Sequence, residues 1–523
     1  MHTPTTARGR YDQLSKERSC YLDRARECAK YTLPMIMPEE GTTQSTRFVT
    51  PYSALPAQAV NTLAAKLLTT LLPPGSPFFK LSMDRMAAEQ AAQIPAPPGS
   101  GADNLKGLVE SQLARTELIA SDEVEAISLR PKAYELFRHL IIAGNVVLEE
   151  NGEDSRVHAL DAFVLKRDGL DRLTELIIKE CISYDDLTGE QALQCRDFSK
   201  TEEEDSELDL YTYASWDYEK SKWVVFQEVN GVELADSRGT YTEDNFPYNA
   251  LRWSRIDKED YGRSYVEEYL GDIISLEELT KSVVQGSAVA SRIVYLVNPG
   301  GFTKPQDLES AENGAYIAGN PEEVKALQSE KAMDLRIASE TIRDIQSSLR
   351  SAFLMVSSVQ RQAERVTAEE IRIMANELEA ALGGIYSLLG DEFQKPLVRR
   401  LLARLGKQKK IPKLPEETVT IKILTGLDAL GRGQDLQRLQ VAIAAIPQPL
   451  QPELFPYING TEYLNRVFKA VGLDPTGLLK DPQEVAAEQQ QAQQQAMIEK
   501  LGPQAIQQAG AMAQTQAQQQ PQG

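Results

Sequence analysis

The chain has 523 residues, of which 42% are hydrophobic and 25% are charged, and this balance is typical of a globular protein with about two to four packed units. Its 56 basic and 76 acidic residues give a net charge of −20, which excludes a protein that grips nucleic acid over a broad basic surface. The sequence contains no run of about 18 uncharged apolar residues and no apolar signal-peptide core, so we expect a soluble chain that is neither secreted nor bound to a membrane.

The first part of the chain is predicted to be helical. Helical patterns cover residues 10–33, 51–79 and, in two pieces, about 103–143. Pro34 stops the first helix, and a Pro-Pro-Gly sequence closes the second, because these residues do not continue a helix. A linker rich in Pro and Gly at 94–101 leads to the next two helices. We expect these segments to form helical core.

The pattern changes between residues 146 and 260. In residues 208–234, aromatic and β-branched residues alternate with polar ones, which is typical of strands that are buried on one face. Glu219-Lys220-Ser221 and Asn230-Gly231 are turn sequences that divide this segment. The segment therefore predicts a three-stranded meander.

Residues 163–183 fit two different structures. Leu173, Leu176, Ile177 and Cys181 suit one face of a helix, whereas Asp168-Gly169 between two apolar runs suits a hairpin. Periodicity alone does not decide between them.

A helical period returns at Gly262. Apolar residues on one broad stripe predict a helix through about Arg292, roughly 45 Å long at about 1.5 Å per residue. Residues 293–331 contain short strands and Gly/Pro turns, after which a second long helix is predicted over about 331–353. Two long helices therefore flank a small irregular module.

Arginine recurs every seven residues on the second long helix. Seven residues are nearly two helical turns, so Arg336, Arg343 and Arg350 lie in a line along one side. For an isolated helix this pattern favours a solvated face on which the arginines pair with neighbours such as Glu340 and Asp344.

Further basic residues follow this helix. A capping box at Thr367-Ala-Glu-Glu370 predicts that a new helix begins near residue 367, and the loop before it carries Arg361 and Arg365. Eight basic residues and no acidic residue lie between Lys395 and Lys413. This cluster suits either a nucleic-acid patch or the positive C-terminal turn of a long helix, and the second interpretation is favoured.

No catalytic, cofactor or metal site is predicted. Residues 419–447 have the pattern of a strand, a Gly-rich turn and a helix, but they lack the further glycine of a dinucleotide-binding loop, and no GxxxxGK[ST] sequence occurs. The three histidines are too few to complete a nearby zinc site with the cysteines, which have no CxxC spacing. We expect buried thiols in a reducing cytoplasm, at Cys20, Cys28, Cys181 and Cys195.

Seven segments, in order along residues 10–480, resemble one family. They are "AGNVVLEE", "YGRSYVEEYLGDIISLEEL", "LVNPGG", "SSVQRQAERVTAEEIR", "ELEAALGGIYSLL", "PLVRRLL" and "TGLDALGRGQDL". These segments resemble the head-to-tail connector, or portal, proteins of short-tailed phages of the autographivirus group. The linker at 94–101, the density of basic residues at 399–410 and the Gln- and Ala-rich tail are not part of the match.

The resemblance implies a portal fold, α+β and mostly helical, that assembles as a ring, typically of twelve copies. In this fold 163–183 is a hairpin of the wing. The implied divisions are N-terminal helices and wing strands at 1–260, stem helices at 261–292 and 332–353, a clip at 293–331, a tunnel loop at 354–366, a long helix and the rest of the wing at 367–440, a crown at 441–482, and a disordered or weakly helical tail at 483–523.

The resemblance also implies a function without enzymatic activity or cofactor. The ring would occupy one capsid vertex of the virion, at the head–tail junction, after assembly in the host cytoplasm, and double-stranded DNA would be packaged and later ejected through it. The implied partners are the terminase large subunit, a tail adaptor, and the major capsid and scaffolding proteins. An acidic, oligomeric scaffold or tail-tube protein without a DNA channel is the alternative.

Charge indicates where such a channel would touch DNA. A strongly acidic ring repels phosphate, so attractive contacts should be confined to a few rings of cationic side chains, independent of base sequence. The candidates are Arg336, Arg343 and Arg350 in the channel, and Gln360, Arg361 and Arg365 in the tunnel loop.

Overall fold

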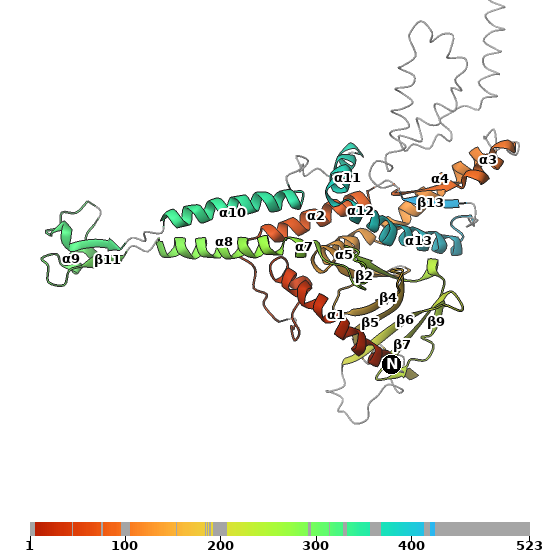
Figure 1. Ribbon diagram of the computed structural model, residues 1–523, viewed down its shortest axis with the longest axis horizontal. Coiled ribbons are helices and arrows are strands. Elements are labelled where there is room, and N and C mark those ends of the chain that lie inside the picture. Colours follow the sequence, from red (N-terminus) through yellow and green to blue (C-terminus); the bar gives the residue numbers. More distant parts are fainter. Residues whose placement is uncertain are drawn as a thin grey trace, which may run out of the picture. The chain divides into compact units, whose positions relative to one another are not determined.

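The computed structural model describes residues 6–43, 45–74, 77–95, 105–152, 154–183, 185, 187, 190–191, 207–290, 294–312, 314–327, 332–355, 368–412 and 419–423. This part of the chain mixes helices and antiparallel sheets and belongs to the first of two compact units, residues 1–429 (Figure 1). The predicted crown and tail, and the tunnel-loop residues 356–366, lie outside the described residues.

Five helices form the N-terminal part, and four of them were predicted. They are α1 (Ala7–Lys30), α2 (Leu55–Leu71), α3 (Arg85–Gln93), α4 (Leu105–Ala126) and α5 (Leu129–Ala143), with a short 3-10 turn at Pro34–Ile36. Thr6 caps α1 by accepting a hydrogen bond from the backbone of Gly9. The sequence pattern missed α3 because this helix is short and buries only Ala91.

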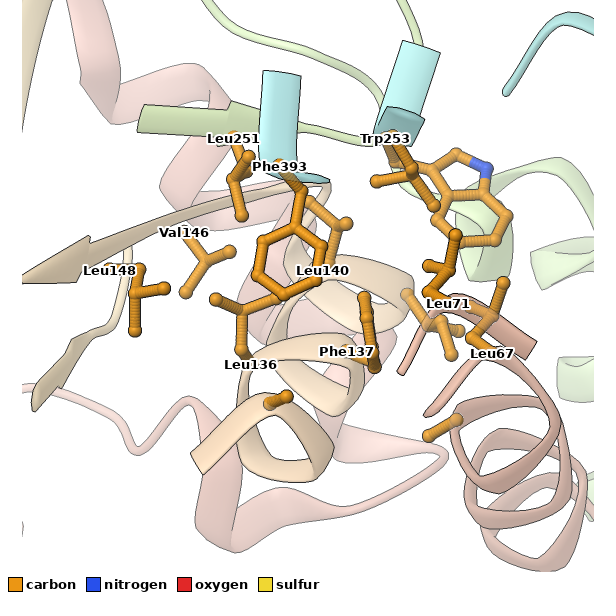
Figure 2. Close-up of a cluster of buried hydrophobic side chains, with 14 of the residues drawn as sticks. Leu67, Leu71, Leu136, Phe137, Leu140, Val146, Leu148, Leu251, Trp253 and Phe393 are labelled. Carbon is orange, nitrogen blue, oxygen red and sulfur yellow. The ribbon is translucent and has the colours of Figure 1, made fainter. Parts of the chain in front are cut away.

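A hydrophobic core joins α2 and α5 to a sheet and to a later helix. Figure 2 shows Phe393 beside Phe137 of α5, and their rings lie 5.5 Å apart at an edge-to-face angle of 77°. The same close-up contains buried side chains from α2, α5, β2 (Asn145–Asn151) and β10 (Tyr248–Arg252), namely Leu67, Leu71, Leu136, Leu140, Val146, Leu148 and Leu251. Segments far apart in the sequence thus share one core.

Two sheets lie between α5 and residue 260. Strand β2 is central in a three-stranded antiparallel sheet with β10 and β3 (Asp154–His158). The larger sheet contains β4 (Phe163–Arg167), β5 (Leu173–Ser183), β6 (Glu207–Asp217), β7 (Lys222–Val229), β8 (Val232–Glu233) and β9 (Gly239–Tyr241).

The larger sheet answers the question that periodicity left open. Residues 163–183 form the β4–β5 hairpin, as the resemblance implies, and Ile177 pairs with Val164 across it. The predicted meander is confirmed as β6, β7 and β8, which turn at Ser221 and at Asn230-Gly231 with positive φ angles. A helical period was plausible in β5 because this strand is buried near its middle on both faces.

Two long helices follow the sheets. A single turn, α7 (Tyr265–Glu268), leads into α8 (Leu270–Ala290), and α10 (Ala332–Ala352) packs alongside α8 (Figure 1). Gly286 permits this approach, since a Cβ atom there would lie 2.9 Å from the Leu335 side chain. Between them, β11 (Val294–Val297) and β12 (Val324–Leu327) form a two-stranded sheet, with α9 (Pro305–Glu309) and a 3-10 turn at Pro321–Glu323.

The chain continues as an interrupted helix. Its parts are α11 (Ala368–Leu382), α12 (Gly384–Leu389), a π-helical turn (Gly390–Gln394) and α13 (Lys395–Lys407). Gly383 separates α11 from α12 with a φ of 50° and a ψ of −117°, a conformation that glycine adopts readily. The Thr367 cap lies outside the described residues. The last described strand, β13 (Val419–Ile423), pairs with β1 (Phe79–Met83), a strand that the sequence pattern did not predict.

The expectation of buried thiols is wrong for two cysteines. Cys28 is buried, but Cys20 and Cys181 are exposed, because they occupy outward positions on α1 and β5. Cys20, Cys28 and Cys181 form no disulfide in the described part of the chain, and Cys195 lies outside it. Within the described part of the chain, no helix is long and apolar enough to span a membrane.

His139 on α5 is expected to make stability depend on pH. Burial lowers the pKa of His139 below its ordinary value of about 6.5, and its buried Nδ1 atom has no hydrogen-bond partner among the described residues. As pH falls below about 6.5, the unfolded chain binds a proton that the folded chain does not, so stability falls through that window.

A His139→Leu variant should therefore lose less thermal stability between neutral and mildly acidic pH than the unaltered protein. The effect of this side chain is at most about 1.4 kcal/mol per pH unit. Thermal unfolding midpoints of both proteins across this pH range provide the measurement, and equal pH dependences would contradict the assignment.

Candidate functional site

The three arginines predicted on the second long helix lie on α10 and are exposed. Neither Glu340 nor Asp344 forms an ion pair with Arg336, Arg343 or Arg350, and within the described residues these three arginines have no ion-pair partner. The internally paired face that an isolated helix favours is therefore not present. Three unneutralised guanidinium groups instead follow one side of α10.

Aromatic side chains hold the C-terminal end of α10 against the start of the other long helix. The rings of Tyr265 and Tyr269 lie 5.0 and 5.5 Å from the ring of Phe353. The Tyr265 hydroxyl donates a 2.8 Å hydrogen bond to the carbonyl oxygen of Ala352, and burial raises the pKa of Tyr265. This end of α10 is therefore anchored.

The long helices expose apolar side chains farther from this anchored end. Val284 and Val289 on α8 are 50% and 67% exposed, and Met333 and Ile337 on α10 are 69% and 60% exposed. Scattered exposed apolar residues are ordinary, but four large ones on two packed helices are typical of a surface that meets another protein.

Two glycines fix the position where the first of the long helices begins. A Cβ atom on Gly262 would lie 2.7 Å from the Ser254 carbonyl oxygen, and one on Gly144 would lie 2.7 Å from the backbone of Arg263. The side-chain amide of Asn145 also donates to the Gly262 carbonyl oxygen at 2.8 Å and accepts from its backbone N–H at 2.7 Å. The segments "AGN" and "YGR" therefore fit together backbone to backbone.

An N-cap and two ion pairs stabilise the first turn of α7. Ser264 is the N-cap of α7: its hydroxyl accepts a hydrogen bond from the backbone N–H of Glu267. Arg263 forms ion pairs with Glu259 at 2.9 Å and Glu267 at 3.0 Å, and the hydrogen bond from Arg263 holds the pKa of Glu259 below its usual range. The Tyr-Gly-Arg-Ser sequence is thus a junction that sets where α7 and α8 begin.

Five of the eight basic residues in the cluster at 395–413 form ion pairs with described residues. Its ion-pair partners are Asp391 for Lys395, Asp244 for Arg399, Glu150 for Arg400, and Glu123 for both Arg404 and Lys410. Glu123 has a lowered pKa because Lys410 hydrogen-bonds to it. The interpretation as a structural feature of a helix end is therefore favoured over a nucleic-acid patch.

The predicted tunnel-loop residues are not among the residues that the structure describes. Gln360, Arg361 and Arg365 are among residues 356–367, which the structure does not describe. Within the described residues, no cluster of His, Cys, Asp and Glu could hold a metal ion.

Sequence reasoning missed Lys66, which lies on α2 with 8% of its side chain exposed. A signal existed, because Lys66 is the one charged residue in a helix otherwise made of apolar and neutral side chains. Such a lysine is rarely buried unless it has a partner, and here Glu377 lies 3.0 Å away.

Comparison with known proteins places the chain in a family. A family model described as "Bacteriophage head to tail connecting protein" matches residues 4–479. The chain belongs to this family. The recognition made from the sequence is therefore confirmed.

Individual head-to-tail connecting proteins are similar over nearly their whole length. The portal protein of Enterobacteria phage T3 is 38% identical over 496 residues, covering 93% of this chain and 91% of that protein. The portal protein of Escherichia phage T7 is 36% identical over 497 residues, covering 94% and 90%. The portal protein of Enterobacteria phage SP6 is 30% identical over 501 residues, covering 93% of each.

Solved structures add little to this assignment. A chain from the "Virion of native gene transfer agent (GTA) particle" is 12% identical and covers 80% of this connecting protein and 90% of that chain, with a TM-score of 0.33. A TM-score this low carries no argument about the fold.

Proposed function

We propose that this connecting protein forms a ring at one capsid vertex, through which double-stranded DNA enters the head and later leaves it. Two observations support this proposal: membership of the head-to-tail connecting family, and three arginines of α10 that form no ion pair with any described residue. The arginines are the main support for a channel, because they give an acidic chain a line of positive charge that no described residue neutralises.

Charge limits how such a channel can hold DNA. Duplex DNA carries one negative charge per about 1.7 Å, and a broad basic wall would bind it too tightly to let it move. With twelve copies, the ring would carry 12 × −20 = −240 charges. Attraction would then be local to Arg336, Arg343 and Arg350, and to Arg361 and Arg365 in the tunnel loop, with Gln360 beside them. These groups would contact phosphates without selecting a base sequence.

The exposed apolar side chains of α8 and α10 fit the same proposal. Val284, Val289, Met333 and Ile337 would be covered by the paired helices of neighbouring copies, which would stand around a central bore. In this arrangement α8 and α10 are the stem helices, and residues 293–331 are the clip between them.

The proposed partners follow from this placement. The clip would receive the terminase large subunit during packaging and a tail adaptor afterwards, and the rest of the ring would meet the major capsid and scaffolding proteins. The tunnel loop at 354–366 would form a constriction, the wing would include the six-stranded sheet, and the crown would be residues 441–482. The proposed site of action is the head–tail junction of the virion, after assembly in the host cytoplasm.

The proposed role requires no chemistry. The relatives are named as portal proteins, and the resemblance implies neither catalytic residues nor a cofactor. A packaging ATPase would be a separate protein, and this chain would provide the passage and the docking surface.

Electron microscopy of the purified full-length protein tests the proposal. We expect closed rings with an open axial hole and, at higher resolution, α8 and α10 beside that hole. Filaments would support a tail-tube protein, and monomers or rings without a bore would also overturn the channel.

A further inference from the structure

A buried lysine joins three helices at the anchored end of α10. The Nζ atom of Lys66, on α2, donates a 2.6 Å hydrogen bond to the carbonyl oxygen of Leu354 and another, at 3.0 Å, to a carboxylate oxygen of Glu377 on α11. Only 8% of the Lys66 side chain is exposed. A buried ammonium group is stable only while such partners remain in place.

The backbone at the C-terminal end of α10 presents carbonyl groups that attract a cation. Leu354 has a φ of 56°, the left-handed region, and the backbone N–H of Met355 donates to the carbonyl oxygen of Arg350 at 2.8 Å, which is the pattern of a Schellman motif. A non-glycine residue there is strained, and carbonyl groups at a helix C-terminus carry partial negative charge. Lys66 supplies positive charge at this point.

The position of Glu377 extends the connection to α11. Leu354 lies just before residues 356–367, and Glu377 lies on the helix that begins just after them. One ammonium group therefore connects the residue before that segment with the middle of the helix after it. If α11 moved away from α10, the buried charge would lose a partner.

We propose that Lys66 is a positioning residue, a clamp that makes the C-terminal end of α10 and helix α11 move as one unit with α2. The clamp rests on the described contacts. Its consequence for DNA rests on the proposed function, in which residues 354–366 are the tunnel loop, because the clamp would then set the stiffness of the loop at both ends.

Hydrogen–deuterium exchange of the full-length assembled protein tests the clamp. Lys66→Met removes the charge and keeps the length of the side chain, so exchange should rise about tenfold in both the last turn of α10 and α11. Glu377→Gln removes one partner only, so exchange should rise in α11 and change little in α10. Lys106→Met, which alters the exposed pair with Glu110 on α4, is the matched control and should leave both segments unchanged.

Combining the variants distinguishes a clamp from general destabilisation. In α11, the double variant Lys66→Met, Glu377→Gln should exchange no faster than Lys66→Met alone. The reason is that both substitutions break the same interaction, the one between Lys66 and Glu377. Additive effects, unchanged exchange, or an equal rise over the whole protein would overturn the clamp. If Lys66→Met does not assemble, Lys66→Arg and Glu377→Gln give the same comparison with smaller changes.

A second measurement separates this inference from the proposed function. DNA held in heads assembled with the Lys66→Met protein should decrease if the clamped ends belong to a channel constriction. Altered exchange with normal DNA retention would leave the clamp supported and contradict the tunnel-loop role, whereas unaltered exchange would reject the clamp itself.

Discussion

Replacing Arg336, Arg343 and Arg350 together with glutamate is expected to leave ring assembly intact and to reduce packaged DNA by roughly tenfold or more. The three arginines are exposed and have no ion-pair partner in the described part of the chain, so their replacement breaks no ion pair there. Each replacement changes the local charge by −2, which is −6 per chain and, for twelve chains, 12 × −6 = −72. In the proposed channel, the glutamate carboxylates would then repel DNA phosphates at the positions where the arginines attract them.

Nuclease-protected DNA per assembled head is the measurement, with electron microscopy of the same rings as the check on assembly. Arg343→Glu alone should show a smaller loss in the same direction. Arg85→Glu is the matched control, because Arg85 is 92% exposed on α3 and has only a surface pair with Glu89. Full packaging by the triple variant in intact rings would show that α10 does not face DNA.

The largest effect on stability is expected for Arg252→Leu. Arg252 is 2% exposed, and its guanidinium lies 3.0 Å from Glu392 in the π-helical turn and 3.7 Å from Asp171 at the β4–β5 turn. Burial, with the nearby charge of Arg252, lowers the pKa of Arg167 to about 10, so this is a dense group of buried charges. Removing one cation leaves Glu392 unpaired there, at a cost of about 3–5 kcal/mol.

Thermal unfolding of the full-length protein measures this effect, and Arg255→Leu provides the control. Arg255 also forms an ion pair with Asp171 but is 53% exposed, so its loss should change stability by less than about 1 kcal/mol. The double variant Arg252→Leu, Glu392→Leu should regain much of the lost stability, because replacing both partners leaves no orphan charge. Equal effects of the two arginines would contradict the role given to burial.

Local patterns predicted most helices and the strand meander because these depend on short-range periodicity and turn residues. Asn230-Gly231 turns the chain where it was expected to, since both residues adopt positive φ angles. The long helices were also predicted, because their apolar stripes persist over many turns. The β4–β5 hairpin needed the family resemblance, because a strand buried on both faces has no alternation to detect.

Features that depend on distant residues could not be predicted. Strand β1 exists because β13, more than 300 positions later, pairs with it, and no local signal specifies that partner. The neutralisation of Arg400 and Arg404 by Glu150 and Glu123 likewise depends on tertiary contacts. For the candidate site, spacing placed three arginines on one side of a helix, but only the fold could show that they form no ion pair with the residues that the structure describes.

The contact between Asn145 and Gly262 has a kinetic consequence. It closes a loop of 117 residues, and the entropy of that closure must be overcome before the contact can form. A chain made from its N-terminus must therefore synthesise the strands of both intervening sheets before this contact can fix the start of α7 and α8. We therefore expect the start of α8 to become fixed late in folding, so that the exposed apolar side chains of the paired helices are held in place only after the sheets have been made.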